Sequence, residues 1–164
     1  MSLKEKINQD YKDFFKAKEE KKVSVLRMLN SAIKNKELEK RTKLIKTVTL
    51  ETELVAQSQL SDEEVVSVLS SEAKRRKDSI EQYNNGGRPE LAAGEEEELK
   101  ILSAYLPEQM GEEEVRKIVG EAIKESGASG VQDLGKVMKV LMPRVKGKAD
   151  GNLVNKIVKE ELEK

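Results

Sequence analysis

Apolar residues recur at α-helical spacing along most of the chain, and the clearest case lies between residues 134 and 145. Six apolar positions there fall three or four residues apart, and they form a single helical face. They are Leu134, Val137, Met138, Leu141, Met142 and Val145. Lys136, Lys139 and Arg144 lie between them. The pattern predicts an amphipathic helix with one apolar side and one basic side.

A tight turn and a second helix are predicted directly after it. Pro143 lacks a backbone N–H and should bend the last turn. Gly147 suits the left-handed residue that ends a helix, and Asp150 suits the N-cap of the next one. The apolar face of that second helix comprises Leu153 or Val154, with Ile157, Val158 and Leu162. We refer to residues 134–162 as the basic hairpin, and Lys146 and Lys148 flank Gly147 in its turn.

The same periodicity predicts four helices before residue 107 and one between residues 112 and 127. The Ser2–Glu5 and Ser61–Glu64 spacings fit capping boxes, so helices should begin there, and Pro89 suits a first helical position. The side chains expected to face inward are Leu3, Ile7, Tyr11, Phe14 and Phe15, then Val25, Leu26, Leu29, Ala32, Ile33 and Leu38, then Val65, Val66, Leu69, Ala73, Ile80 and Tyr83, then Leu91, Leu99, Leu102 and Leu106, and finally Val115, Ile118, Val119, Ala122 and Ile123.

Two stretches interrupt this pattern. Residues 42–59 contain β-branched patches, and we expect an extended or partly helical insertion there. Residues 107–111 hold a proline and a glycine, and we interpret them as a linker between domains. The predicted fold is therefore all-α, with an N-terminal helical domain of about four helices at residues 1–106 and a C-terminal three-helix domain at residues 112–164.

Composition agrees with helices and removes many kinds of chemistry. Charged residues make up 38% of the chain and aromatic residues 3%, which is typical of amphipathic helices. Cysteine and histidine are both absent. Disulfides, thiolate catalysis, the commonest general base and the commonest metal ligand are therefore excluded. No apolar run approaches the length needed to span a membrane, and the first residues lack the apolar segment of a signal peptide. We therefore expect a cytoplasmic protein with no membrane partner.

No catalytic site, cofactor site or metal site is predicted. Serine and lysine stand one helical turn apart at Ser31–Lys34 and at Ser71–Lys74, a spacing that some nucleophilic enzymes use. That spacing arises by chance in a lysine-rich helical chain, and the companion motifs are missing. The Gly-Lys pairs at 135–136 and 147–148 lack the upstream glycine of a P-loop.

Charge is distributed unevenly, although the chain is neutral overall. Residues 136–159 carry seven Lys or Arg against one Asp, and residues 16–46 carry eleven against four Glu. We interpret the second region as a solvated face, because exposed helix faces are commonly lysine-rich. Residues 90–114 carry nine Glu and one Lys, so a polyanion should avoid them.

The sequence of the basic hairpin resembles the GatB/YqeY family, which includes the tail of the amidotransferase B subunit. The resemblance rests on Gly-Lys-Val-Met at 135–138, Pro-Arg-Val-Lys-Gly-Lys-Ala-Asp-Gly at 143–151 and Leu-Val-Asn-Lys at 153–156, with further similar segments at 27–34, 77–83, 98–102, 105–109 and 127–129. Residues 42–59 depart from the family pattern, since they are longer than the short connection expected there.

The resemblance implies an N-terminal helical domain followed by a three-helix domain that contacts tRNA. It also implies an association with carbon-nitrogen ligase chemistry that uses glutamine as the amido-N-donor, in translation, although the catalytic parts of an amidotransferase are absent here. The expected RNA contacts are Lys136, Lys139, Lys146, Lys148 and Asn155. Gly135, Gly147 and Asp150 are assigned to the turn structure.

Charge supports the same function, because lysines on rigid helices suit the phosphates of a folded RNA and the few aromatics argue against base stacking. The expected partners are tRNA or another structured RNA and, in addition, an aminoacyl-tRNA synthetase or an amidotransferase. The alternative is a protein-interaction module that docks on such a synthetase or amidotransferase through its apolar or acidic helix faces.

Overall fold

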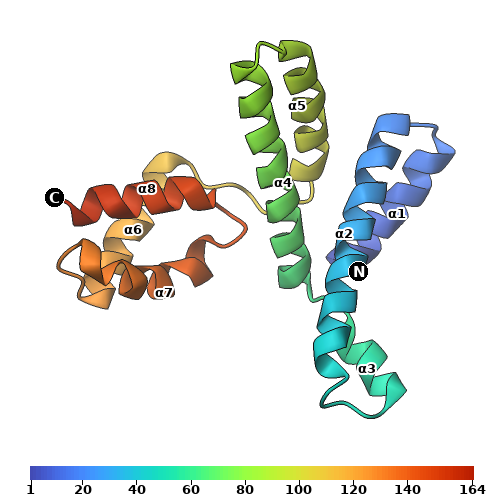
Figure 1. Ribbon diagram of the computed structural model, residues 1–164, viewed down its shortest axis with the longest axis horizontal. Helices are drawn as coiled ribbons and strands as arrows, with labels where there is room; N and C mark the ends of the chain where they lie inside the picture. The colour runs from blue at the N-terminus through green and yellow to red at the C-terminus, as the bar shows by residue number, and fades with distance from the viewer. The chain divides into compact units, whose positions relative to one another are not determined.

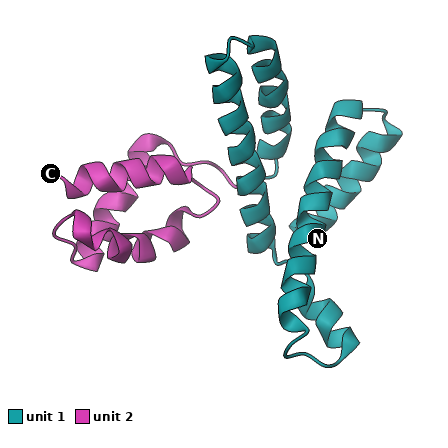
Figure 2. Cartoon of the chain, in the orientation of Figure 1, with its two compact units in different colours: residues 1–105 teal, residues 106–164 magenta.

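The computed structural model describes residues 1–164 as eight α-helices and one short 3-10 turn, with no strand (Figure 1). The predicted all-α class is confirmed. The chain divides into two compact units, Met1–Tyr105 and Leu106–Lys164 (Figure 2). The first unit holds five helices where about four were expected, because part of the 42–59 insertion forms a helix.

The N-terminal unit is built from α1 (Leu3–Lys16), α2 (Glu20–Leu44), α3 (Glu51–Ser58), α4 (Asp62–Asn85) and α5 (Pro89–Ser103). Helices α4 and α5 form one hairpin and α1 and α2 form another, as Figure 1 shows. Helix α2 also contacts α3, α4 and α5, and it is therefore the element on which the unit is assembled. None of the eight helices has the length and apolar character needed to cross a membrane.

Capping residues set several of the helix limits. Ser2 accepts a hydrogen bond from the Glu5 N–H while the Glu5 carboxylate accepts one from the Ser2 N–H, and Ser61 and Glu64 repeat this arrangement. Both capping boxes predicted from the sequence are thus confirmed. Pro89 occupies the first position of α5, also as predicted.

Helix α1 ends in a turn where a lysine takes the place usually held by glycine. The Glu19 N–H donates to the Phe14 carbonyl and the Lys18 N–H donates to the Phe15 carbonyl, which is the hydrogen-bond pattern of a Schellman motif. Lys18 has a φ of 58°, the only positive value at a non-glycine residue. Its backbone is therefore held in a strained left-handed conformation.

The core of this unit contains most of the predicted side chains, with three corrections. Ile7, Leu26, Leu29, Ile33, Leu69 and Leu102 are fully buried, but Phe15, Leu38 and Leu91 are exposed. At 3.6 residues per turn, Phe15 lies about 80° around α1 from Ile7, and Leu38 lies about 140° around α2 from Ile33. The packed faces are narrower than the apolar stripes. Leu91 lies in the first turn of α5, where Ala92 is buried instead.

One arginine of the basic run at residues 74–77 faces inward. Arg76 is 6% exposed, and its Nη2 lies 2.8 Å from Glu98 of α5, while Nη1 lies 3.8 Å from Glu72. Its Nε has no hydrogen-bond partner. Arg76 therefore joins α4 to α5 and offers no charge to an outside ligand.

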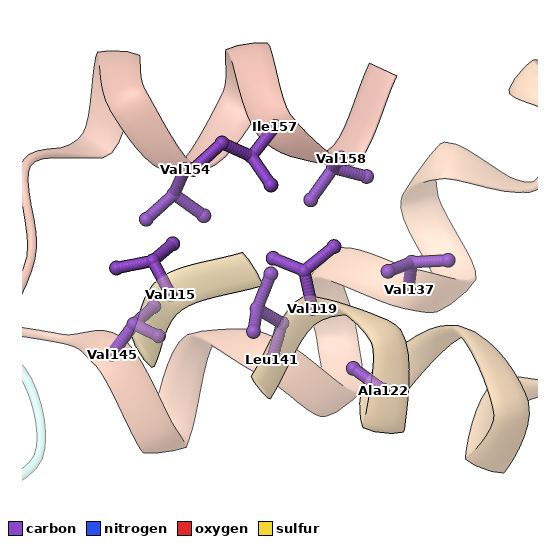
Figure 3. Packing of buried hydrophobic residues seen from close by; sticks show 9 residues of the cluster. All are labelled: Val115, Val119, Ala122, Val137, Leu141, Val145, Val154, Ile157 and Val158. Carbon is purple, nitrogen blue, oxygen red and sulfur yellow. The ribbon is translucent and has the colours of Figure 1, made fainter. Parts of the chain in front are cut away.

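The C-terminal unit is a three-helix arrangement of α6 (Glu112–Ser126), α7 (Leu134–Val145) and α8 (Gly151–Leu162), with the 3-10 turn Val131–Asp133 before α7. Its core joins all three helices (Figure 3). The buried residues are Val115, Val119, Ala122, Val137, Leu141, Val145, Val154, Ile157 and Val158. Gly127 ends α6 with a φ of 67°, as predicted.

Candidate nucleic-acid interface

Helix α7 directs its apolar side inward and leaves its basic side in solvent. Val137, Leu141 and Val145 are buried against α6 and α8 (Figure 3). Lys136 precedes Val137, Lys139 lies between Val137 and Leu141, and both lysines are exposed. The predicted amphipathic helix is therefore present, although Met142 of the predicted apolar face is 42% exposed. Helix α7 also continues past Pro143 to Val145.

The turn between α7 and α8 is held by backbone hydrogen bonds. Gly147 adopts a left-handed φ of 77°, as a helix-ending glycine commonly does, and it is buried. The N–H groups of Lys148 and Ala149 both donate to the carbonyl of Val145, at 2.9 and 3.0 Å. The side chains of Lys146 and Lys148 are exposed on either side of Gly147.

Residues before α6 also brace this turn, which the sequence did not indicate. The Met110 N–H donates to the Lys148 carbonyl at 2.7 Å, and the Gln109 side-chain amide donates to the Gly147 carbonyl at 2.8 Å. Both residues belong to the stretch interpreted as a linker, 107–111. The sequence offers only a glutamine between a proline and a glycine there, with no helical periodicity, so these contacts could not be predicted from it.

Asp150 closes the start of α8. Its carboxylate accepts hydrogen bonds from the N–H groups of Asn152, at 2.8 Å, and Leu153, at 3.3 Å. The N-cap role assigned to Asp150 is thereby present. The same bonds occupy two amides that would otherwise be open to an anion, so the start of α8 is not by itself a free anion site.

The lysines differ in the partners that they already have. Lys136 lies 3.0 Å from the Asp133 carboxylate. The Ser129 N–H and Lys136 together hold the pKa of Asp133 below its usual value, with the backbone hydrogen bond as the larger cause. Lys139, Lys146 and Lys148 form no ion pair and no side-chain hydrogen bond. Three unpaired charges thus lie along α7 and its turn.

The other residues of the basic hairpin singled out from the sequence have a weaker structural case for a role in the site. Asn155 is exposed on α8 and has no side-chain hydrogen bond within the chain. Gly135 lies exposed in the first turn of α7, and a Cβ there would meet no atom within 4 Å. Since its φ is not positive, the structure gives Gly135 no role in a turn, unlike Gly147. Arg144 pairs with Glu125 and Glu121 of α6 and is already neutralised.

Geometry offers no support for a Ser–Lys catalytic pair. The Ser71 hydroxyl donates to the Ser67 carbonyl at 3.0 Å, and the Ser31 hydroxyl donates to the Arg27 carbonyl at 3.0 Å. Each hydroxyl therefore bonds to its own helix and not to the lysine one turn ahead. The chain also has no group of three or more carboxylate, histidine or cysteine side chains placed to hold a metal ion.

Comparison with known proteins identifies relatives over nearly the whole chain. The family model described as "Yqey-like protein" matches residues 4–162. Two curated relatives carry the name "Altered inheritance of mitochondria protein 41, mitochondrial". The one from Pyrenophora tritici-repentis is 28% identical over 145 residues, which covers 83% of this chain and 80% of the relative. The one from Vanderwaltozyma polyspora is 27% identical over 135 residues, or 78% of this chain and 64% of the relative.

Both names refer to mitochondria, and that statement concerns those two proteins. The cytoplasmic location expected for this chain stays a prediction. Neither name refers to an RNA, an amidotransferase or a reaction.

Proposed function

Because this chain belongs to the YqeY-like protein family, we propose that it is an RNA-binding module that contacts tRNA or another structured RNA through its basic hairpin. In this proposal Lys139, Lys146 and Lys148 bind phosphates directly. Lys136 joins them by exchanging Asp133 for a phosphate, and Asn155 donates or accepts a hydrogen bond at the edge of the surface. The module has no catalytic site of its own.

One observation carries the proposal: three lysines without ion pairs project from α7 and from a turn that hydrogen bonds hold in place. Four backbone or side-chain hydrogen bonds fix the segment 147–149, and Gly147 and Asp150 set its entry and exit. A preorganised cation needs little ordering when it binds, so more of its attraction for a phosphate is retained. Surface lysines on mobile segments lack this advantage.

The dimensions suit a polyanion better than a single phosphate ion. Lys136 and Lys146 are ten residues apart, which corresponds to about 15 Å along a helix that rises 1.5 Å per residue. Charges spread over that length match successive phosphates of a nucleic-acid backbone. Phosphate contacts position a protein without reading sequence, so recognition in this proposal follows the shape of a folded RNA.

The proposal also relates the chain to tRNA-dependent amidotransferases. The chain would hold or deliver tRNA for a partner that performs the carbon-nitrogen ligase reaction, and that partner would be an amidotransferase or an aminoacyl-tRNA synthetase. The absence of histidine and cysteine and the bonding of Ser31 and Ser71 to their own helices support a role without chemistry.

A second candidate function is docking on such an enzyme through apolar side chains. Four large aliphatic residues are between 42% and 63% exposed around the end of α2 and along α3. They are Leu38, Ile45, Leu50 and Val55. An exposed apolar group of this kind is typical of protein contact surfaces.

Salt dependence of tRNA binding distinguishes these functions. Three or four phosphate contacts predict a slope of log affinity against log salt between about −3 and −4, since each contributes roughly 0.9 on a duplex. Affinity for bulk tRNA, measured by fluorescence anisotropy, should then fall about 100-fold between 50 and 200 mM salt. A slope near zero, or no binding at the lower salt concentration, would refute the RNA proposal and favour protein docking.

A further inference from the structure

The last two turns of α1 carry an exposed aromatic surface. Three of the five aromatic residues of the chain lie there, at Tyr11, Phe14 and Phe15. Phe14 is half-buried beneath the ammonium of Lys22, which lies 4.6 Å from its ring centre. Phe15 is 62% exposed, and its ring lies 6.4 Å from that of Tyr11. A phenylalanine so open to water buries little surface in the folded chain and is available to a ligand.

Phe15 lines both of two hollows in the surface. The larger, of about 480 Å³, is lined by Phe15, Lys18, Glu20, Val23, Ser24 and Arg27. The smaller, of about 250 Å³, is lined by Tyr11, Lys12, Phe15 and Lys16. We refer to the two together as the Phe15 groove.

Cations without partners surround this ring. Lys12, Lys16, Lys18 and Arg27 are exposed and form no ion pair or side-chain hydrogen bond. Two lysines at the start of α2 behave differently, since Lys21 pairs with Glu97 and Lys22 with Glu19. Glu20 is the one acidic residue that lines the groove. The groove therefore carries a net positive charge that the chain itself does not neutralise.

The strained backbone at Lys18 contributes to this arrangement. Its left-handed conformation, with a φ of 58°, closes the turn in which a glycine would be relaxed. A glycine there would leave the larger hollow without the Lys18 side chain. Strain retained at a residue that lines a hollow is a feature of ligand-binding sites.

We propose that the Phe15 groove binds an unpaired nucleotide of a bound RNA, with its base stacked on the Phe15 ring and its flanking phosphates held by Lys16, Lys18 and Arg27. An aromatic ring set among cations is the arrangement by which proteins bind single-stranded nucleic acid. The inference rests on the proposed RNA-binding function and adds a second contact to it. It differs from two expectations drawn from the sequence, that the lysines of residues 16–46 form only a solvated face and that the few aromatic residues argue against base stacking.

The geometry favours a nucleotide over an acidic peptide. A peptide helix anchors itself by apolar side chains in a continuous apolar groove. The hollows beside Phe15 are open, and their lining surface is mainly apolar although most of the lining side chains are charged or aromatic. Val23 is the only aliphatic residue that lines them, so a peptide helix would find no row of aliphatic side chains to pack against. A flat base needs one ring face and adjacent positive charge, and both are present.

A tryptophan reporter tests the stacking directly. The chain has no tryptophan, so Phe15→Trp creates a single fluorophore at the groove. A single-stranded RNA 10-mer should quench its emission, because a stacked base quenches indole fluorescence, whereas polyphosphate of equal charge should not. The control Leu91→Trp, at a 40% exposed position on the acidic helix α5, should respond to neither. Equal quenching by RNA and polyphosphate, or none by RNA, would overturn the inference.

Affinities of three variants separate stacking from apolar packing. Phe15→Ala and Phe15→Leu should each weaken binding of the 10-mer about tenfold, because each removes the ring on which one base stacks. Phe15→Tyr keeps an aromatic ring and should bind the 10-mer as the wild type does. Full binding by Phe15→Leu would contradict stacking, and so would a Phe15-dependent response to an acidic amphipathic peptide alone. Folded tRNA is measured in parallel: if tRNA fails to bind but the 10-mer shows the Phe15 dependence, the groove assignment stands and the hairpin function fails.

Discussion

Tyr105 links the two ends of the N-terminal unit through one hydrogen bond. Its hydroxyl donates to the Asp10 carboxylate of α1 at 2.7 Å, and its ring, which is 8% exposed, lies 5.8 Å from the ammonium of Lys6. Burial, followed by the hydrogen bond and the negative charge of Asp10, raises the pKa of Tyr105 above its usual value. The neutral form of the phenol is therefore stabilised by folding.

A pH dependence follows from this raised pKa. Because the pKa is higher in the folded than in the unfolded chain, the stabilisation is complete below the unfolded value, about 10, and is lost as pH rises above it. The wild type should thus lose melting temperature above pH 10 more steeply than Tyr105→Phe. At pH 7 the variant should be less stable by about 1 kcal/mol, for one lost hydrogen bond. If the melting temperatures of the two proteins fall equally between pH 8 and 11, the raised pKa of Tyr105 does not contribute to stability.

At the scale of single elements, the turn of the basic hairpin depends on Gly147. Its φ of 77° is strained for any residue with a Cβ, so Gly147→Ala should destabilise the C-terminal unit by about 1–2 kcal/mol. Denaturant unfolding followed by circular dichroism measures this cost. Gly135→Ala is the matched control, because Gly135 is helical and open, and it should be neutral or slightly stabilising. Equal destabilisation by both substitutions would show that the turn is not specifically strained.

Local signals account for the elements that could be predicted from the sequence. The capping boxes at Ser2 and Ser61, the left-handed Gly147 and the Asp150 cap each follow from residues within one turn of the helix end. The exposure of Phe15 could not be predicted, since it depends on how wide a face of α1 is packed. The bracing of the turn by Gln109 likewise depends on a contact 38 residues away along the chain.

The candidate site also has a part that could be predicted from the sequence and a part that could not. Charge density placed Lys139, Lys146 and Lys148 in the basic hairpin, and the structure leaves all three exposed and unpaired. Ion pairs within the fold cannot be seen in composition, so Arg144 counted as basic although Glu125 already neutralises it. Whether residues 107–111 separate two independently folding domains stays a prediction.

On the scale of the whole molecule, the two proposed contact surfaces are both basic, and the acidic stretch of residues 90–114 separates them along the chain. The basic hairpin lies in the C-terminal unit and the Phe15 groove in the N-terminal unit. In the proposed function, a protein of zero net charge would therefore attract a polyanion through local charge rather than through its overall field. The proposed function depends most on the basic hairpin as the RNA contact.

The most direct measurement is the salt dependence of tRNA affinity for the double variant Lys146→Ala with Lys148→Ala. Two lost phosphate contacts should weaken binding and flatten the slope of log affinity against log salt by about two units. The control removes the same charge from α6 by Lys117→Ala with Lys124→Ala, two exposed lysines without ion pairs, and it should keep the wild-type slope. If the control weakens and flattens binding as much as the hairpin variant, with both proteins folded by circular dichroism, the basic hairpin is not the RNA contact.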